Sequence, residues 1–351
     1  MTGSPQDFWV ITTYFNLTNG AKRLENYRCF RRHLAAPLLT VEWNPGNRFQ
    51  LRDDDADIVL RVGSGDLMWQ KERLLTMAIA ALPDHVDYIA WIDCDVLFDN
   101  PDWQDEARAL LHDKPVVQLF SEVAFPDESE CLRLIDSQQS SRGATISDRV
   151  SKRESFLGIF GRLKEDIVGF DLSRRFQPDE TNSYNIMKRP AYGFAWAAQS
   201  AFLRQVGVYD RGIMGGGDML FSYGVSGLGQ ALIDNHKTAG WAFYGDCPSY
   251  RRWAAQAAEA CGGQLSCIGG RILHLFHGSL QQRQYKSRID GLVPFGLDLD
   301  RDIIAATGQP WSWRRDRDRL NEYFLTYLRD RNEDGGTPAP QGLSIPLRTA
   351  D

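Results

Sequence analysis

The chain has 351 residues, 43% of them hydrophobic, with a formal net charge of −6 and a pI near 5.6. This length and apolar content supply a folded core for one large α/β domain or two smaller ones. The acidic balance argues against a nucleic-acid-binding protein, which would normally carry a strongly basic face. Small or neutral partners are therefore expected.

The amino-terminal residues and the cysteines bear on location. Residues 1–7 contain neither a basic stretch nor an apolar one, and no segment approaches the roughly 20 apolar residues that span a bilayer. Peripheral membrane association is left open. The six cysteines include no closely spaced metal-binding pair, which suits free thiols in a reducing compartment. We expect a cytoplasmic protein.

Strands and helices alternate over residues 7–120. We expect strands at 8–15, 38–43, 57–62 and 88–96, and helices at 21–34 and 69–82. Such alternation predicts an α/β protein with a central, mostly parallel sheet flanked by helices. Ligands of such sheets gather at the carboxyl ends of the strands.

The second half of the chain has a different texture. Residues 126–189 are polar with weak periodicity, so we expect loops and short helices that form a lid or acceptor wall. After them we expect a strand at 192–198, a short helix at 200–206, a glycine turn at 213–217, a buried strand at 271–277 and an amphipathic helix near 320–328.

We treat residues 1–332 as one domain. Its nucleotide-binding half covers about 7–120, and its acceptor and catalytic half covers about 121–332. The tail 333–351 is rich in Pro and Gly and is expected to be disordered.

Asp93 and Asp95 follow an apolar, β-prone run and lie one residue apart. Asp-x-Asp recurs elsewhere in the chain, but only this pair has large apolar side chains on both sides. Burying carboxylates is unfavourable by several kcal/mol unless something compensates, and a divalent cation is the usual compensator. The pair therefore predicts a site for Mn²⁺ or Mg²⁺. The alternative is that both carboxylates cap the turn that follows.

His274 and His277 form a second candidate cluster. In a regular strand they point to opposite faces, so only one would reach a metal unless the chain kinks at Gly278. A lone histidine in an apolar strand is more often a hydrogen-bonded core residue. With two at the mouth of a turn, we expect at least one to bind the metal and favour His277. Arg283 or Lys286 would then meet a diphosphate.

Gly215, Gly216, Gly217 and Asp218 form a third motif. Three glycines permit close backbone approach to a ligand, and the carboxylate after them can accept a proton. The alternative is a glycine turn in which Asp218 serves as the N-cap of the following helix. The motif is neither a dinucleotide-binding fingerprint nor a P-loop.

Together these motifs resemble the metal-dependent glycosyltransferases of the GT-A fold, in which an Asp-x-Asp at a strand end holds Mn²⁺ and a nucleoside diphosphate sugar. The run from Tyr192-Gly193-Phe194 to Gly216-Gly217-Asp218 resembles the carboxyl-terminal module of the β-1,4-galactosyltransferases. That resemblance implies that Asp218 is the general base and that His277 is a metal ligand, with His274 as a helper. The chain departs from the family pattern at Gly217, where the family has Glu, and at Cys94, where it usually has Val.

The resemblance also implies where a nucleotide sugar binds. The candidate residues after the first strand, where GT-A enzymes hold base and ribose, are Thr12, Thr13, Tyr14 and Asn16. Lys71 and Arg73 open the helix before the metal strand and would contact the diphosphate, although a solvated helix face is equally expected there. Asp93, Cys94 and Arg283 complete the nucleotide-sugar set, and Gly216, Gly217 and Trp196 are the candidates for sugar contacts. For Trp196 a core role is the commoner outcome.

The expected activity is transfer of a hexose or N-acetylhexosamine from a UDP-sugar to a hydroxyl of a glycan or small molecule. Asp95 would bind the metal, Asp93 would contact ribose or a metal-bound water, and Asp218 would deprotonate the acceptor and invert the anomeric centre. A retaining transferase is one alternative. A sugar nucleotidyltransferase is another, although residues 12–16 lack its glycine-rich phosphate loop. A third is a non-catalytic carbohydrate-binding module that uses the ten tryptophans.

Overall fold

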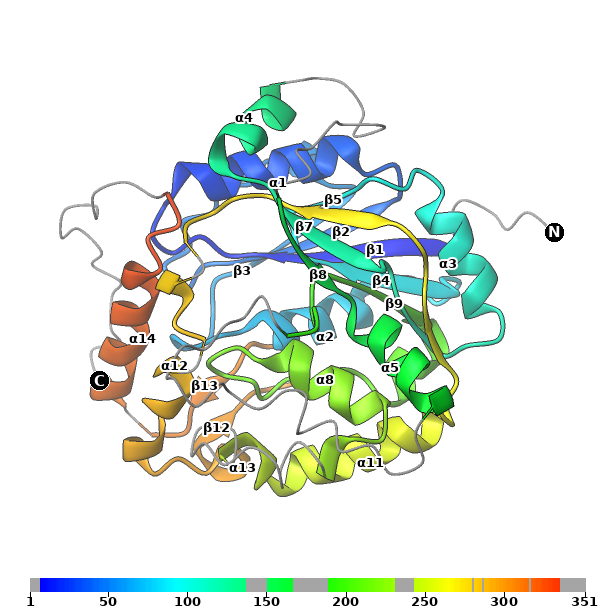
Figure 1. Ribbon diagram of the computed structural model, residues 1–351. Helices are drawn as coiled ribbons and strands as arrows, with labels where there is room; N and C mark the ends of the chain where they lie inside the picture. Colours follow the sequence, from blue (N-terminus) through cyan, green and yellow to red (C-terminus); the bar gives the residue numbers. More distant parts are fainter. Residues whose placement is uncertain are drawn as a thin grey trace.

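The computed structural model describes residues 7–136, 150–166, 189–230, 243–279, 281–285, 287–315 and 317–334. Its main sheet has seven strands in the order β10-β6-β9-β4-β1-β2-β3. They are β1 (Phe8–Tyr14), β2 (Leu38–Trp43), β3 (Ile58–Val62), β4 (Tyr88–Ile92), β6 (Val116–Gln118), β9 (Ala195–Gln199) and β10 (Leu265–Cys267). Among these seven, only β9 runs antiparallel to its neighbours. The predicted, mostly parallel sheet is confirmed (Figure 1).

A second sheet adjoins the first and has the strand order β5-β11-β7-β8. Its strands are β5 (Val96–Phe98), β7 (Glu122–Phe125), β8 (Ser151–Glu154) and β11 (Arg271–His274), and a small hairpin pairs β12 (Ile303–Ile304) with β13 (Ser312–Trp313). Only three residues, 93–95, separate β4 of the main sheet from β5 of the second. The strand predicted over 88–96 is therefore interrupted, and the Asp-x-Asp motif forms the turn between two sheets.

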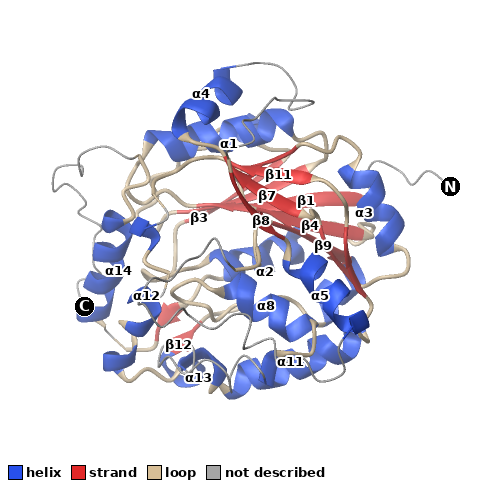
Figure 2. Ribbon diagram, viewed as in Figure 1, coloured by secondary structure: helices blue, strands red, loops and turns tan. Residues whose placement is uncertain are grey.

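Helices lie on both faces of the main sheet (Figure 2). The helices of the described residues are α1 (Ala21–His33), α2 (Lys71–Ala81), α3 (Trp103–Leu111), α4 (Glu128–Asp136), α5 (Phe156–Asp166), α7 (Ser200–Gln205), α8 (Gly217–Val225), α11 (Pro248–Cys261), α12 (Ser287–Asp290), α13 (Leu299–Asp302) and α14 (Asp318–Asp330), with 3-10 turns η1 (Asp53–Asp55), η3 (Gln281–Arg283) and η4 (Val293–Phe295). The predicted α/β class, with a central sheet flanked by helices, is confirmed.

Two apolar clusters form the core, one on each face of the sheet. On one face Phe8 and Val10 of β1 pack with residues of α1 and α3. On the other, Ile11 packs with residues of α2, α7, α8, α11 and α14. Burial on both faces explains why these strands are nearly continuous apolar runs, as parallel strands usually are.

The segment predicted as loops and short helices, 126–189, is described only in part. It contains α4, β8 and α5, while residues 137–149 and 167–188 lie outside the described residues. All six cysteines are free thiols, as the composition predicted. None of the described helices is long and apolar enough to cross a membrane.

Candidate functional site

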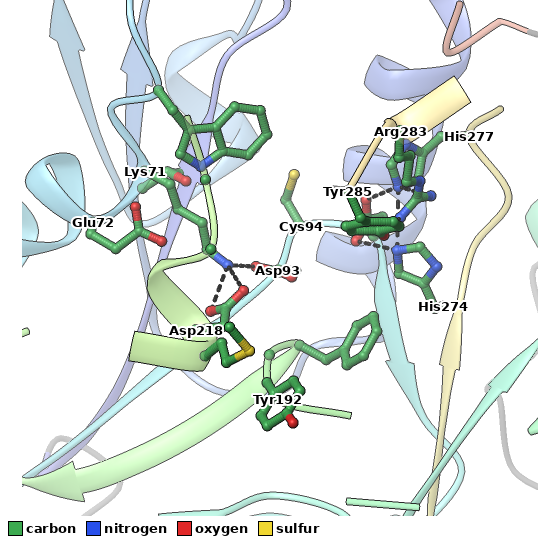
Figure 3. Close-up of a pocket in the computed structure, with 18 of the residues that line it drawn as sticks. Lys71, Glu72, Asp93, Cys94, Tyr192, Asp218, His274, His277, Arg283 and Tyr285 are labelled. Carbon is green, nitrogen blue, oxygen red and sulfur yellow. Dashed lines mark hydrogen bonds and ion pairs between the residues drawn. The ribbon is translucent and has the colours of Figure 1, made fainter. Parts of the chain in front are cut away.

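A pocket opens where the carboxyl ends of β1 and β4 meet the amino-terminal ends of α2 and α8 (Figure 3). It encloses about 1150 Å³, including the solvent at its mouth. Its lining side chains come from segments far apart in the sequence: Arg23 of α1, Lys71 and Glu72 of α2, residues 93–95, residues 192–194, Gly215, Gly216, Asp218, Met219, His274, His277, Arg283, Tyr285, Arg288 and Arg331. The pocket therefore collects all three motifs of the sequence at the edge of the sheet where ligands are expected.

Asp95, His274 and His277 converge at one end of this pocket. Asp95 Oδ2 lies 3.0 Å from His277 Nε2, and Asp95 Oδ1 lies 3.7 Å from His274 Nε2. The two Nε2 atoms are 3.2 Å apart. Strand β11 ends at His274, so the chain leaves the extended conformation before His277. Both imidazoles therefore face the same carboxylate, whereas a regular strand would have sent only one of them there.

The three buried side chains offer a donor set for a borderline divalent cation. One ligand atom from each lies within 4.8 Å of the others, and Asp95 Oδ1 is buried without a hydrogen-bond partner among the described residues. Burial, reinforced by the charge of Arg283, lowers the pKa of His274 well below its usual value. Its imidazole is then neutral, which is the form that binds metals. Two imidazoles and a carboxylate suit Mn²⁺ better than Ca²⁺.

Arginine and glutamate side chains surround His277. Arg283 Nη2 lies 2.8 Å from His277 Nε2, the same nitrogen that faces Asp95. Glu333 Oε1 lies 3.5 Å from His277 Nδ1 and also accepts from Arg331 at 2.7 Å and Arg23 at 3.3 Å. Burial opposes ionisation of Glu333, but Arg23 and Arg331 hold the pKa of its carboxyl well below the usual value.

The segment of Glu333 begins the tail that was expected to be disordered. Glu333 and Asp334 are described, and Asp334 accepts hydrogen bonds from the first amides of α1, at 3.1 Å from Ala21 N and 3.0 Å from Lys22 N. Residues 335–351 lie outside the described residues.

Lys71 lies on the opposite side of the pocket, between the carboxylates of Asp93 and Asp218. Its Nζ lies 2.7 Å from Asp93 Oδ1 and 3.1 and 3.2 Å from the carboxylate oxygens of Asp218. Burial opposes the charge of Lys71, but Asp218, Asp93 and Glu72 raise its pKa well above the usual value. Lys71 is therefore a fixed ammonium between two carboxylates, and Asp93 faces it rather than the Asp95 cluster (Figure 3).

Asp218 reaches the pocket because glycines surround it. Gly215 and Gly216 have φ of +77° and +89°, which only glycine adopts freely. A Cβ on Gly193 would lie 2.5 Å from Asp218 Oδ2, so a larger residue there would displace the carboxylate. The N-cap of α8 is Gly216, and Asp218 is the second residue of the helix, turned toward Lys71.

Glu72 is a pocket residue that the sequence motifs did not single out. It is 5% exposed, and burial raises its pKa to about 8 against the opposing charge of Lys71. Its spacing from Leu75 and Ile79 places it on the buried face of α2, which is the one local signal that could have revealed it. The other missed lining residues, among them Arg23, Arg288 and Arg331, come together only through the fold.

The predicted nucleotide-sugar residues divide into two groups. Those that line the pocket are Thr13, Lys71, Asp93, Cys94 and Arg283. Thr12 instead donates to the Ile92 carbonyl at 2.6 Å, and Tyr14 donates to Gln50 at 2.7 Å. Asn16 holds the loop by donating to the Gly20 carbonyl at 2.7 Å and to Gln50 at 2.9 Å.

Two further candidates lie away from the pocket lining. Arg73 is bound to Asp210 at 3.1 Å and to the carbonyls of Ala306 and Gln309. Trp196 is 1% exposed and stacks on Trp91 in the core. Of the sugar-site glycines, Gly216 lines the pocket and Gly217 packs against Glu72. Lys286 lies outside the described residues.

Comparisons with known proteins add little to this geometry. No family model matches the chain, and no curated protein does. Three solved structures of S. aureus TarS are similar to it. The first has 12% identity and a TM-score of 0.30, over 62% of this chain and 32% of that one. TarS 1-349 in complex with UDP-GlcNAc has 11% identity and a TM-score of 0.29, over 62% of this chain and 52% of that one. TarS 1-349 has 8% identity and a TM-score of 0.31, over 87% of this chain and 95% of that one. This chain thus spans about a third of the first structure's length, and likenesses at such TM-scores carry no argument.

Proposed function

We propose that this protein is a metal-dependent glycosyltransferase that moves a hexose or N-acetylhexosamine from a UDP-sugar to an acceptor hydroxyl. One observation carries the proposal: a single pocket contains a carboxylate with two imidazoles at one end and the Asp218 carboxylate, held by Lys71, at the other. The first group suits a cation that would hold a diphosphate, and the second suits a base that would receive a proton.

The metal would be held by Asp95, His274 and His277. When bound, Mn²⁺ or Mg²⁺ would supply positive charge for the oxygens of the leaving diphosphate. The unpartnered Asp95 Oδ1 supports this assignment, because a buried carboxylate oxygen needs a partner that the described protein atoms do not provide, and the neutral imidazole of His274 is the form that binds metals. Asp93 faces Lys71 and would act in donor contacts instead.

Arginine side chains would hold the rest of the donor. Arg283 contacts His277, Arg23 and Arg331 pair with Glu333 beside it, and Arg288 lines the same pocket near Gly215. Guanidinium groups recognise phosphate oxygens through paired hydrogen bonds, so these residues would orient the diphosphate and stabilise it as it leaves. Thr13 and Phe15, from the end of β1 and the loop after it, line the wall where the nucleoside would lie.

Asp218 would act as the general base. The acceptor hydroxyl would give its proton to the Asp218 carboxylate while its oxygen attacks the anomeric carbon. The bond from that carbon to the diphosphate oxygen would break, releasing UDP and inverting the anomeric configuration. Lys71 would keep the Asp93 and Asp218 carboxylates apart from one another and fixed in place, which preserves the geometry of attack.

Donor binding provides the first test. Thermal unfolding would be followed with a panel of UDP- and GDP-sugars, with and without Mn²⁺. We expect one or more UDP-sugars to raise the melting temperature only when Mn²⁺ is present, since a ligand of the folded state stabilises it in proportion to its affinity. No shift with any nucleotide sugar would contradict the proposal.

Two variants separate inversion from retention. Asp95→Ala should abolish transfer under either mechanism. Asp218→Asn should lower kcat by a factor of about 10² to 10⁴ if Asp218 is the base of an inverting enzyme. Substantial transfer by Asp218→Asn, with its fold intact, would favour retention.

A further inference from the structure

The side chain of Glu72, from α2, lies where the side chain of residue 217, in α8, would lie if that residue were not glycine. A Cβ built on Gly217 would lie 2.2 Å from Glu72 Oε1 and 2.3 Å from its carboxyl carbon. The carboxyl of Glu72, projecting from α2, therefore fills the position where a side chain at residue 217 would begin. Residue 217 directly precedes Asp218, so the Glu72 carboxyl lies beside the proposed base (Figure 3).

The Glu72 carboxyl has few protein partners for a buried group. It interacts with its own backbone amide in the first turn of α2, but within the described residues it accepts no hydrogen bond from another side chain, and its charged neighbours are Lys71, Asp218 and Asp93. Burying a carboxyl with so few donors disfavours its charged form, and here burial raises its pKa to about 8. Such a group in a pocket lining is a candidate for ligand binding.

We propose that Glu72 binds the acceptor, by a hydrogen bond to the hydroxyl next to the one that Asp218 deprotonates, and that the acceptor is an uncharged carbohydrate. This inference rests on the proposed transferase activity. In the β-1,4-galactosyltransferases, which the chain resembles, the residue before the base is Glu. Here α2 supplies a carboxyl to the same place, and Gly217 leaves room for it.

The chemistry of this end of the pocket favours an uncharged sugar. Neighbouring sugar hydroxyls can donate to one carboxyl and accept from or donate to a second, which suits Asp218 and Glu72 together. An acceptor that ends in a phosphate would be repelled by Asp93 and Asp218. The ring of Tyr192 also lines the pocket and suits the C–H surface of a sugar ring.

The experiment removes the carboxyl group from residue 72 and, in one variant, places a carboxyl group at residue 217 instead. Transfer would be followed as UDP release, using the UDP-sugar that stabilises the wild-type chain most. The acceptors would be glucose, galactose, N-acetylglucosamine and their 6-phosphates. The variants are Glu72→Ala, Glu72→Gln and the double variant Glu72→Ala with Gly217→Glu, and Glu259→Gln on the exposed side of α11 is the control.

We expect at least one uncharged sugar to be used in preference to its phosphate. Glu72→Ala should raise the acceptor KM about tenfold, which is near the upper effect of one lost hydrogen bond to an uncharged carboxyl. Glu72→Gln should raise it less, and the double variant should recover most of the loss. The dissociation constant of UDP should stay within about twofold in all of them, as in the control, because Glu72 lies on the acceptor side.

An unchanged acceptor KM in Glu72→Ala would overturn the proposal, as would a double variant no better than the single one. Preference for a phosphorylated acceptor, or no use of any uncharged sugar by the wild-type chain, would overturn the assignment of the acceptor. Glu72→Gln keeps the shape of the side chain. If Glu72→Ala does not fold, the acceptor KM of Glu72→Gln is the test, and an unchanged value would overturn the proposal. Absence of any UDP-sugar binding by the wild-type chain is a separate result, which would remove the transferase proposal itself.

Discussion

The turn between β4 and β5 sends two neighbouring carboxylates in different directions. Asp95 faces His274 and His277, and Asp93 faces Lys71. The Phe194 carbonyl accepts from Asp93 N at 2.7 Å, and the Asp95 carbonyl accepts from Leu275 N at 2.8 Å, so the turn is fixed at both ends. The two side chains therefore face different groups, although only one residue separates them.

The proposed metal site leads to a prediction that contrasts these two aspartates. Asp95→Asn should weaken Mn²⁺ binding at least about a hundredfold, because it removes the one charged oxygen donor among the three proposed ligands. Asp93→Asn is the matched control and should weaken it only a few-fold, since Asp93 is paired with Lys71. Mn²⁺ titrations followed by electron paramagnetic resonance would measure both. Equal losses would mean that Asp93 also binds the ion.

The local sequence pattern was sufficient to single out some residues of the pocket and not others. Asp95, His277 and Asp218 stand out because a polar group in an apolar or glycine-rich run is unusual. Arg23 and Arg331 carry no such signal, because long side chains on helix surfaces are ordinary. Their place in the pocket depends on contacts between residues about 300 positions apart in the chain.

At the scale of elements, the end of α14 connects the carboxyl-terminal segment to the proposed metal site. Arg331 follows the helix and pairs with Glu333, which in turn faces His277 Nδ1. A carboxylate on the far nitrogen of a metal-binding imidazole fixes its tautomer and orientation. Asp334 adds an attachment to the first turn of α1.

We therefore predict that Glu333→Gln weakens Mn²⁺ binding about tenfold while the fold is retained. The reason is that Gln keeps the shape but not the charge that orients His277, and losing such a partner typically lowers metal affinity 10- to 100-fold. Isothermal titration calorimetry with Mn²⁺ would measure the change. Glu322→Gln, on the exposed face of α14, should bind Mn²⁺ like the wild-type chain. Wild-type affinity in Glu333→Gln would show that His277 needs no such support.

The elements themselves were predictable to different degrees. Strand β2 has the predicted limits 38–43, because a β-prone run between Pro37 and the turn residues that begin at Asn44 specifies a short strand. The break between β4 and β5 was not predicted, since Ile92 and Val96 are equally β-prone and the second sheet that β5 joins depends on β11, far along the chain. Tertiary pairing decided the limits there.

For the molecule as a whole, the distribution of charged side chains in the pocket says more about its ligands than the net charge of −6 does. Arg23, Arg283 and Arg331 lie around His277 together with Asp95 and Glu333, whereas Glu72, Asp93 and Asp218 gather around Lys71. Arginines are thus concentrated at one end of the pocket, and carboxyl groups around a single lysine at the other. This polarity supports a strongly anionic donor and an uncharged acceptor.

The acidic end should also make the stability of the whole protein depend on pH. Glu72 has a pKa of about 8 in the folded chain, raised chiefly by burial from the 4.5 expected when the chain is unfolded. Between these values the folded state retains a proton that the unfolded state has lost. The free energy of unfolding should therefore fall as the pH rises from about 5 to 8, and this contribution is fully lost above pH 8.

Comparison of the wild-type chain with Glu72→Gln isolates that contribution. Urea unfolding of both chains, in the presence of a chelator, should show a fall on the order of 3 kcal/mol more in the wild type between pH 5 and 8. Asp93, whose pKa burial raises to about 6, is present in both chains and cancels to first order. Glu259→Gln should follow the wild-type curve. Parallel curves for Glu72→Gln and the wild type would mean that Glu72 is ionised throughout this range, with Lys71 outweighing the effect of burial.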